Sequence, residues 1–543
     1  MKYLYSLLLI PLLSSCYQGE TADLIIHNAT IYSCDEEFTI YEAMAIKDGK
    51  ILQMGPEREI LNGYDCDQVI DLQKAPVYPG FHDAHCHFEG YARTLSEVDL
   101  NGSTSFEEVV SRLEDFNKTN EFDWIKGRGW DNTLWENDGF PNNDTLNILF
   151  PDIPVAIRRV DGHAALVNQK ALDIAGYTAE TTIEGGLVEV IDGKCTGILL
   201  DNAYDSLAIH IPNIKLDQQL TLLQEAEADL FELGLTSIND AGIESKNRQK
   251  FIDWYANGDL KIKNYIMLFP DEDNLRFAQN NGDFKEGNLH IRSFKVISDG
   301  ALGSRGACLN ESYSDKEHHH GFMLRSLEEF KAIAEVAASI DYQVNSHCIG
   351  DSANRTILMV YEEFIGSKLD HRWKIEHAQV IAPEDFDYFE NYKIIPSIQP
   401  THCTSDMRWA EQRLGPERVK HAYAYQQLLE KAGLVALGTD FPIERISPLE
   451  TFYAAVSRMD RNGKPKGGFQ IENALSREAA LRGMTIWAAF SNFEEKEKGS
   501  LEAGKDADFV ILTQDIMKIE YAEILKTFVD KTYLKGELVY SAE

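Results

Sequence analysis

The stretch Pro79-Gly80-Phe81-His82-Asp83-Ala84-His85-Cys86-His87 closes an apolar run that begins at Val77 and is typical of a buried strand. In an extended strand, residues two apart face the same way, so His85 and His87 point two imidazoles at one place. Histidine is the commonest protein ligand for zinc-like ions. An isolated His-x-His is weak evidence, because surface and core pairs are also common. The rest of the chain must therefore decide between these interpretations.

Short apolar runs alternate with segments of helical apolar spacing, such as 216–233, 327–339 and 419–432. The predicted strands are 77–87, 235–240, 262–268, 291–297, 342–347, 373–377, 393–398 and 435–440. Eight strands that alternate with helices predict an α/β fold, specifically a (β/α)₈ TIM barrel.

The two ends of the chain show a sequence pattern different from that of the barrel. Short strands and turns fill residues 17–79 and return at 499–543, and Asp48-Gly49 carries a hairpin signal. We therefore predict one small β-sandwich domain built from both ends, with the barrel at 80–498 between them. The interval from about 100 to 210 is longer than one helix needs, which predicts an inserted subdomain after the first barrel strand.

Residues 1–16 have the pattern of an export signal. Lys2 precedes an apolar run at 7–13, and small residues precede Cys16. The pattern resembles a bacterial lipoprotein signal peptide, in which Cys16 is lipidated; a plain secretory peptide cut nearby is the alternative. We expect a protein of the bacterial cell envelope, on the periplasmic or cell-surface side, that is membrane-anchored through this lipid alone.

The chain is strongly acidic. Its 52 Lys and Arg face 88 Asp and Glu, for a formal net charge of −36 over 543 residues. Such a surface repels phosphate backbones and argues against nucleic acid as a partner. A small molecule is the expected partner, and self-association as a homodimer stays open.

Lys295 stands in the fourth predicted barrel strand between Phe294 and Val296, so its side chain faces the barrel interior. An unpaired buried ammonium is costly. It therefore needs a partner, for which Asp299 is available, or a depressed pKa, or chemical modification. An amine of depressed pKa can react with CO₂ to a carbamate, whose oxygens could bridge two cations.

Further ionisable residues end other strands. His347 ends the fifth, His377 the sixth and Asp440 the eighth. Any single histidine is better explained as a satisfied core residue. Four histidines, one lysine and one aspartate at strand ends of one barrel indicate a shared site at its carboxyl end. Imidazole and carboxylate ligands suit Zn²⁺, Mn²⁺ or Fe²⁺.

With these residues the chain resembles the amidohydrolase superfamily, specifically amidohydrolase family 3, which includes enzymes similar to N-substituted formamide deformylase. The resemblance covers nearly the whole chain after residue 16. Its motifs are 22–29, 79–87, Gly129-Trp130-Asp131, Asp161-Gly162-His163-Ala164, 295–305, His347-Cys348-Ile349-Gly350-Asp351, Ile375-Glu376-His377-Ala378-Gln379, Gly438-Thr439-Asp440-Phe441-Pro442 and 499–509.

The resemblance implies a set of metal ligands, with one or two divalent cations and zinc favoured. They are His85, His87, Lys295 as a carbamate formed with CO₂, His347, His377 and Asp440. Asp440 would also accept a proton. The expected reaction is metal-dependent hydrolysis of a carbon–nitrogen bond in a small non-peptide, formamide-like amide, by metal-activated water with Asp440 as general base.

Alternatives remain. The same metal site would serve a cyclic amidase, a deaminase, or an esterase acting on ester or phosphoester bonds. A non-catalytic lipoprotein that binds a metal or ligand is a second class, against which Asp440 speaks.

Four residues are candidates for substrate binding. Trp130, Asp131 and His163 lie in the predicted insertion, and Arg305 follows the fourth strand. Packing is the alternative for Trp130, a surface loop for His163, and an ion pair with an acidic neighbour for Arg305.

Overall fold

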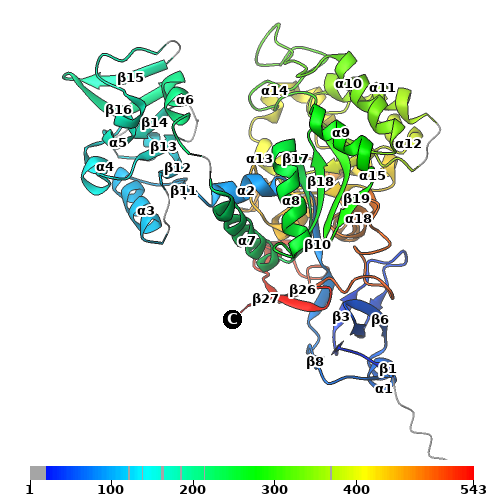
Figure 1. Ribbon diagram of the computed structural model, residues 1–543. Helices are drawn as coiled ribbons and strands as arrows, with labels where there is room; N and C mark the ends of the chain where they lie inside the picture. The colour runs from blue at the N-terminus through cyan, green and yellow to red at the C-terminus, as the bar shows by residue number, and fades with distance from the viewer. Residues whose placement is uncertain are drawn as a thin grey trace, which may run out of the picture. The chain divides into compact units, whose positions relative to one another are not determined.

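The computed structural model describes residues 20–119, 123–136, 139–159, 164–183, 186–212, 214–366 and 370–542. They form two compact units (Figure 1). The first unit holds the chain up to Cys86 together with Asp229–Ala256 and Lys261–Glu543, and the second holds His87–Ala228 and Asn257–Leu260.

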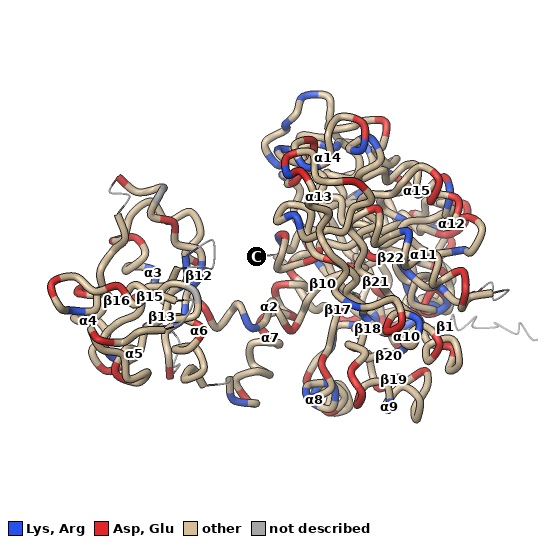
Figure 2. The backbone as a smooth tube through the Cα atoms, turned by 90° about the horizontal axis from the view of Figure 1, so that it is seen from above, with Lys and Arg blue, Asp and Glu red and all other residues tan. Residues whose placement is uncertain are grey.

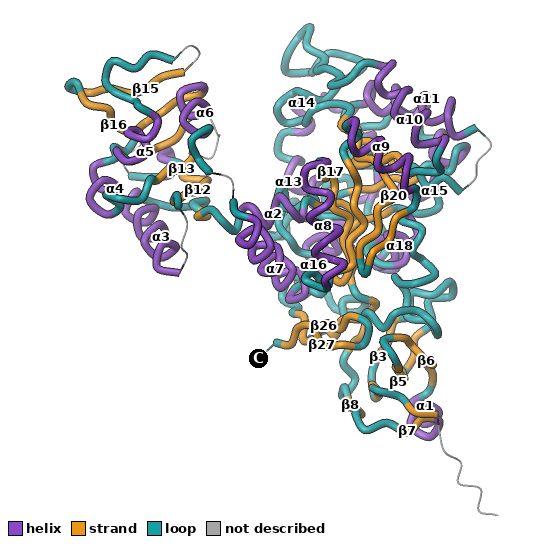
Figure 3. The backbone as a smooth tube through the Cα atoms, in the orientation of Figure 1, coloured by secondary structure: helices purple, strands orange, loops and turns teal. Residues whose placement is uncertain are grey.

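Eight parallel strands of the first unit form a nearly closed barrel. Several of them lie side by side in Figure 3. They are, in spatial and chain order, β10 (Phe81–Cys86), β17 (Leu235–Ile243), β18 (Lys263–Leu268), β20 (Leu289–Ile297), β21 (Gln343–Cys348), β22 (Lys374–His377), β23 (Ile395–Ile398) and β24 (Ala436–Leu437). The amide of Asp440 donates to the carbonyl of His85 at 2.8 Å and links the last strand to the first. The predicted TIM barrel is confirmed.

The barrel helices follow from apolar spacing. Helix α10 (Leu327–Ser339) has the predicted bounds and begins at a capping box made by Ser326 and Glu329. Its buried residues recur at helical spacing on one face: Phe330, Ile333, Ala334 and Ala337. This face packs inward because apolar burial stabilises the helix more than its intrinsic propensity does.

The first predicted strand, 77–87, is wrong in one respect, because it is two strands of different sheets. β9 (Pro76–Pro79) belongs to a terminal sheet and β10 to the barrel. A Cβ at Gly80 would lie 2.3 Å from Oγ1 of Thr236, so only glycine permits this close approach. The amide of Gly80 donates to the carbonyl of Asp508 at 2.9 Å. The chain therefore passes from one sheet to the other at Gly80.

A six-stranded sheet combines both ends of the chain. Its order is β27 (Glu537–Ser541), β26 (Val529–Leu534), β25 (Phe509–Leu512), β9, β3 (Thr30–Tyr32) and β4 (Ile40–Tyr41). A four-stranded sheet has the order β6 (Lys50–Gly55), β5 (Ala43–Lys47), β2 (Leu24–His27) and β8 (Val69–Asp71). One core takes Ile26 and Met44 from the second sheet and Val77 and Phe509 from the first. The predicted sandwich of both chain ends is confirmed.

The second unit starts directly after β10 and has its own mixed sheet. The strand order is β11 (Val98–Asp99), β12 (Ile125–Trp130), β13 (Val155–Arg159), β14 (Ala164–Val167), β16 (Lys194–Asp201) and β15 (Gly186–Ile191). The unit is wider than the predicted segment of about 100–210, because α2 (Phe88–Thr94) and most of α7 (Leu216–Glu232) belong to it.

Acidic positions recur along the chain in both units (Figure 2). In the described part of the chain, no helix is long and apolar enough to cross a membrane. The predicted signal peptide, 1–16, and its Cys16 lie outside the described residues.

Candidate metal centre

Five of the six predicted metal ligands belong to the first unit, near the carboxyl ends of barrel strands. His85 lies in β10, Lys295 in β20, His347 in β21 and His377 at the end of β22, while Asp440 follows β24. Because parallel strands share one carboxyl end, the topology alone brings these residues to the same end of the barrel.

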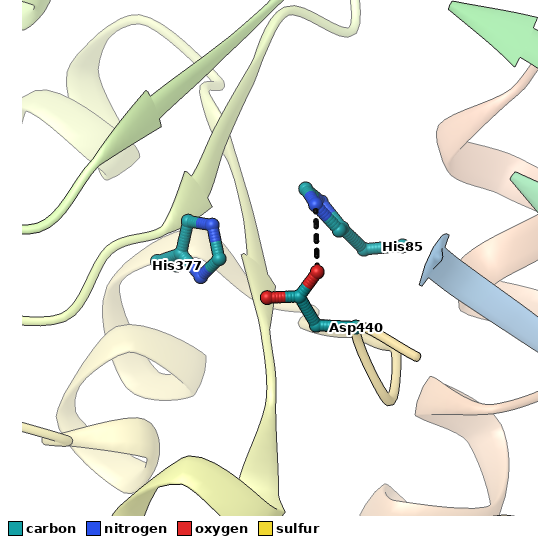
Figure 4. A group of neighbouring side chains, drawn as sticks. All are labelled: His85, His377 and Asp440. Carbon is teal, nitrogen blue, oxygen red and sulfur yellow. Dashed lines mark ion pairs between the residues drawn. The ribbon is translucent and has the colours of Figure 1, made fainter. Parts of the chain in front are cut away.

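Three of these side chains form a compact donor group. One ring nitrogen each from His85 and His377 and one carboxylate oxygen of Asp440 lie within 4.8 Å of one another. Oδ1 of Asp440 is 3.6 Å from Nε2 of His85, and Figure 4 shows the three side chains turned toward a common space. All three residues are buried. Two imidazole nitrogens and a carboxylate oxygen are a donor set that suits zinc.

Lys295 and His347 border the same space. Nζ of Lys295 lies 2.8 Å from Nε2 of His85. The ring centroid of His377 lies 4.4 Å from that of His347 and 5.0 Å from that of His85. The structure thus brings together His85, Lys295, His347, His377 and Asp440.

The backbone is unusual at two of these residues. His377 has φ 73° and Asp440 has φ 62°, in the left-handed region that residues other than glycine rarely adopt. Such conformations cost free energy and cluster at functional sites. At His377 the departure from the extended form also changes the direction of the side chain at the end of β22.

Burial keeps the imidazoles neutral. It lowers the pKa of His347 to about 3 and holds the pKa values of His85 and His377 below their ordinary range. Burial also lowers the pKa of Lys295. A neutral imidazole carries the lone pair that binds a metal, so these shifts favour the ligand form.

Two buried nitrogens test whether a cation fits. Nε2 of His347 and Nδ1 of His377 have no hydrogen-bond partner among the described residues. A buried polar atom without a partner costs about 1–3 kcal/mol. A divalent cation would satisfy both lone pairs, so the residues present fit a metal of the zinc type.

We compared the whole sequence with protein families and with known proteins. The model of the amidohydrolase family, Amidohydro_3, matches residues 68–540. The chain belongs to this amidohydrolase family. The protein LONG AFTER FAR-RED 3 of Arabidopsis thaliana is 31% identical over 567 residues, which cover 99% of this chain and 96% of that protein. The N-substituted formamide deformylase of Arthrobacter pascens is 26% identical, with 95% and 98% covered.

A solved structure has a similar fold and sequence. A metal-dependent hydrolase from Pyrococcus horikoshii OT3 superposes with a TM-score of 0.76 at 28% identity, covering 92% of this chain and 98% of that one. Together with the family match and the buried donor group, this makes the protein a metal-dependent hydrolase of the amidohydrolase superfamily.

Three residues of the amidohydrolase site were not predicted. Oε2 of Glu376 accepts a hydrogen bond from Nδ1 of His85 at 2.6 Å. His402 lies 3.1 Å from Asp440 and 3.3 Å from Glu444, and it follows the seventh barrel strand, the only signal in the sequence that could have indicated it. Metal-ligating histidines usually donate their second nitrogen to such a carboxylate, which fixes the tautomer.

Two further expectations concern the ligands. His87 is the half-buried residue that precedes α2, and it belongs to the second unit, so its role as a ligand stays a prediction. Asp299 is not the partner of Lys295. Its carboxylate instead accepts hydrogen bonds from the amides of Cys308, Ile349 and Gly350.

The structure places the substrate-binding candidates as follows. Trp130 is fully buried in the core of the second unit and donates to the carbonyl of Ile157, as the packing alternative expects, and its contact with substrate stays a prediction. Asp131 pairs with Arg159 at 2.6 Å. Arg305 pairs with Asp315 at 2.8 Å, the alternative that the acidic surroundings suggested. His163 lies outside the described residues.

Proposed function

We propose that this amidohydrolase cleaves the carbon–nitrogen bond of a small, non-peptide amide, with N-substituted formamides as the first substrates to test. The observation that carries the proposal is the position of Asp440, whose Oδ1 lies 3.6 Å from the metal-facing nitrogen of His85. A carboxylate there can accept a proton from water at the metal. The similarity to N-substituted formamide deformylase supports an amide as the bond that is cleaved.

One of the predicted metal ligands is also the proton acceptor. His85, His347 and His377 would hold the cation through neutral nitrogens, and Asp440 through a carboxylate oxygen. When bound, the cation lowers the pKa of water and polarises the substrate carbonyl. Asp440 accepts the proton of the attacking water and returns it to the leaving nitrogen. We infer Zn²⁺, as one or two ions, because imidazole nitrogen and carboxylate oxygen are its usual ligands in catalytic sites.

We also propose that Lys295 is converted to a carbamate. Its neutral amine would attack CO₂, form an N–C bond and release one proton to solvent. Asn345 is paired with Lys295 on the neighbouring strand, so both side chains face the barrel interior. The side-chain amide of Asn345 is fully buried and has no hydrogen-bond partner among the described residues. An oxygen of the carbamate would give this amide an acceptor.

Carbon-13 NMR of protein equilibrated with labelled bicarbonate tests the carbamate. We expect one carbamate resonance that disappears in Lys295→Ala and on unfolding. The same resonance in Lys295→Ala would assign the label to another amine, and no resonance in the native metal-loaded protein would refute the carbamate.

A substrate panel tests the reaction. Wild-type protein and Asp440→Asn are compared on N-formyl amines, N-acyl amino acids, cyclic amides, and ester controls, with metal analysis of the same samples. We expect wild-type protein to release the amine from an N-formyl substrate and Asp440→Asn to fail while remaining folded. Turnover of the ester controls alone would replace the amide proposal by ester hydrolysis.

A further inference from the structure

His402 lies between two carboxylates at the edge of the metal centre. Helix α13 (Pro400–Asp406) follows β23 and carries it. Nε2 of His402 lies 3.1 Å from Oδ2 of Asp440, and Nδ1 lies 3.3 Å from Oε1 of Glu444. Glu444 is itself fixed, because the hydroxyl of Ser405 donates to its Oε1 at 2.6 Å. Hydrogen bonds thus connect Ser405 to Glu444, Glu444 to His402, and His402 to Asp440. Asp440 is a predicted metal ligand.

Both ring nitrogens of His402 face carboxylate oxygens in this arrangement. Ionised carboxylates only accept hydrogen bonds, so a ring nitrogen that bears a proton donates to one of them. Both nitrogens of His402 are therefore occupied by carboxylates.

The two oxygens of Asp440 have different neighbours. Oδ1 faces Nε2 of His85 at 3.6 Å, while Oδ2 accepts from His402. A carboxylate held through one oxygen keeps the other in a fixed direction, because rotation would break a charge-assisted hydrogen bond. The ring of His402 also stacks on that of His377, with centroids 5.8 Å apart and planes at 18°. His402 thus contacts two of the three residues drawn in Figure 4.

We propose that His402, held by Glu444, is a positioning residue that fixes the carboxylate of Asp440 so that Oδ1 faces the metal. The proposal rests on the proposed function insofar as Asp440 is a metal ligand and proton acceptor. It predicts that removal of His402 weakens metal binding through Asp440 while the barrel stays folded.

Metal binding by matched variants tests the proposal without any substrate. The proteins are wild type, His402→Ala, His402→Gln and Glu444→Gln. The readouts are Zn²⁺ affinity by competition with a chromophoric chelator, the visible spectrum of the Co²⁺-loaded protein, and thermal unfolding. His371→Ala is the matched control, because His371 is buried and bonded to the carbonyl of Tyr392, away from the predicted ligands.

We expect His402→Ala to bind Zn²⁺ about 10- to 100-fold more weakly, as for other partners of metal ligands. Its Co²⁺ spectrum should change, because the coordination by Asp440 changes. His402→Gln should regain most of the affinity and the native spectrum, since its amide can still donate to Oδ2. The Zn²⁺ affinity of Glu444→Gln should lie between those of His402→Ala and His402→Gln. His371→Ala should lose stability but keep the affinity and spectrum.

Two results would overturn the proposal: a His402→Ala protein with native affinity and spectrum, or a His402→Gln protein as impaired as His402→Ala. If His402→Ala does not fold, the order of wild type, His402→Gln and Glu444→Gln decides in the same way. Wild-type protein that binds Co²⁺ but hydrolyses no amide would refute the proposed substrate and leave this test intact. Wild-type protein that binds no divalent cation would refute both.

Discussion

Glu376 and His85 share a hydrogen bond of 2.6 Å between Oε2 and Nδ1, and both side chains are fully buried. Burial acts to raise the pKa of Glu376, but the interaction with His85, which includes this hydrogen bond, and the charge of Lys374 outweigh it and lower the pKa to about 2. The ionised carboxylate therefore keeps the proton of His85 on Nδ1, so that Nε2 carries the lone pair that would bind a metal.

Replacement of Glu376 by Gln should make the proton of His85 less firmly fixed on Nδ1. We expect Glu376→Gln to bind Zn²⁺ about 10- to 100-fold more weakly, measured by chelator competition. Glu272→Gln is the control, since Glu272 is exposed on α9 (Glu272–Asn281). Equal affinities in Glu376→Gln and wild type would remove Glu376 from the metal site.

Asp440→Asn should abolish most turnover while the protein stays folded. A general base contributes about 10²- to 10⁴-fold, and the amide of asparagine cannot accept the proton. The measurement is kcat on any accepted substrate, with circular dichroism as the check on folding. Asp387→Asn is a surface control that should leave kcat unchanged. Native kcat in Asp440→Asn would exclude the base role.

The barrel and most of its strand-end residues could be predicted because their signals are local. An apolar run, a helical segment and an ionisable residue at the end of the run are all read within about ten residues. His85, Lys295, His347, His377 and Asp440 were found in this way. The break at Gly80 was missed, because it depends on Thr236, a residue far along the chain.

Glu376 could not be found by the same reasoning, and His402 only by its place after the seventh strand. Glu376 precedes His377, and strict alternation along a strand sends one of two consecutive side chains outward. The φ of 73° at His377 breaks that alternation, and no pattern in the sequence reports it. His402 acquires its role only from Asp440 and Glu444, which follow another strand.

His290 should make stability depend on pH. It bonds Glu494 at 3.1 Å and Asp283 at 2.8 Å. Burial acts to lower its pKa, but these two hydrogen bonds outweigh it and raise the pKa above the ordinary value. A histidine whose pKa is raised by folding stabilises the folded protein. This contribution is fully present at pH values below the unfolded pKa of about 6.5, and it is lost as the pH rises through the folded pKa.

His290→Gln should therefore lower the free energy of unfolding by about 1–3 kcal/mol at about pH 6, and by less at about pH 9. Thermal or urea unfolding of both proteins across this range measures the difference. A difference that stays constant, or that grows toward alkaline pH, would contradict the assigned charge of His290.

Cys16 is expected to carry the lipid anchor. Expression of the full chain in a bacterial host with labelled fatty acid should give a labelled protein in the membrane fraction, and Cys16→Ser should lose the label. Labelled Cys16→Ser would assign the lipid elsewhere, and an unlabelled wild-type protein cleaved near residue 16 would support the secretory alternative.

The measurement that tests the central claim most directly is turnover after removal and return of the metal. Protein treated with a chelator should lose activity on every accepted substrate, and stoichiometric Zn²⁺ should restore it in wild type but not in His377→Ala. Full turnover by metal-free protein, verified by elemental analysis of the same sample, would contradict a metal-dependent hydrolase built on His85, His377 and Asp440.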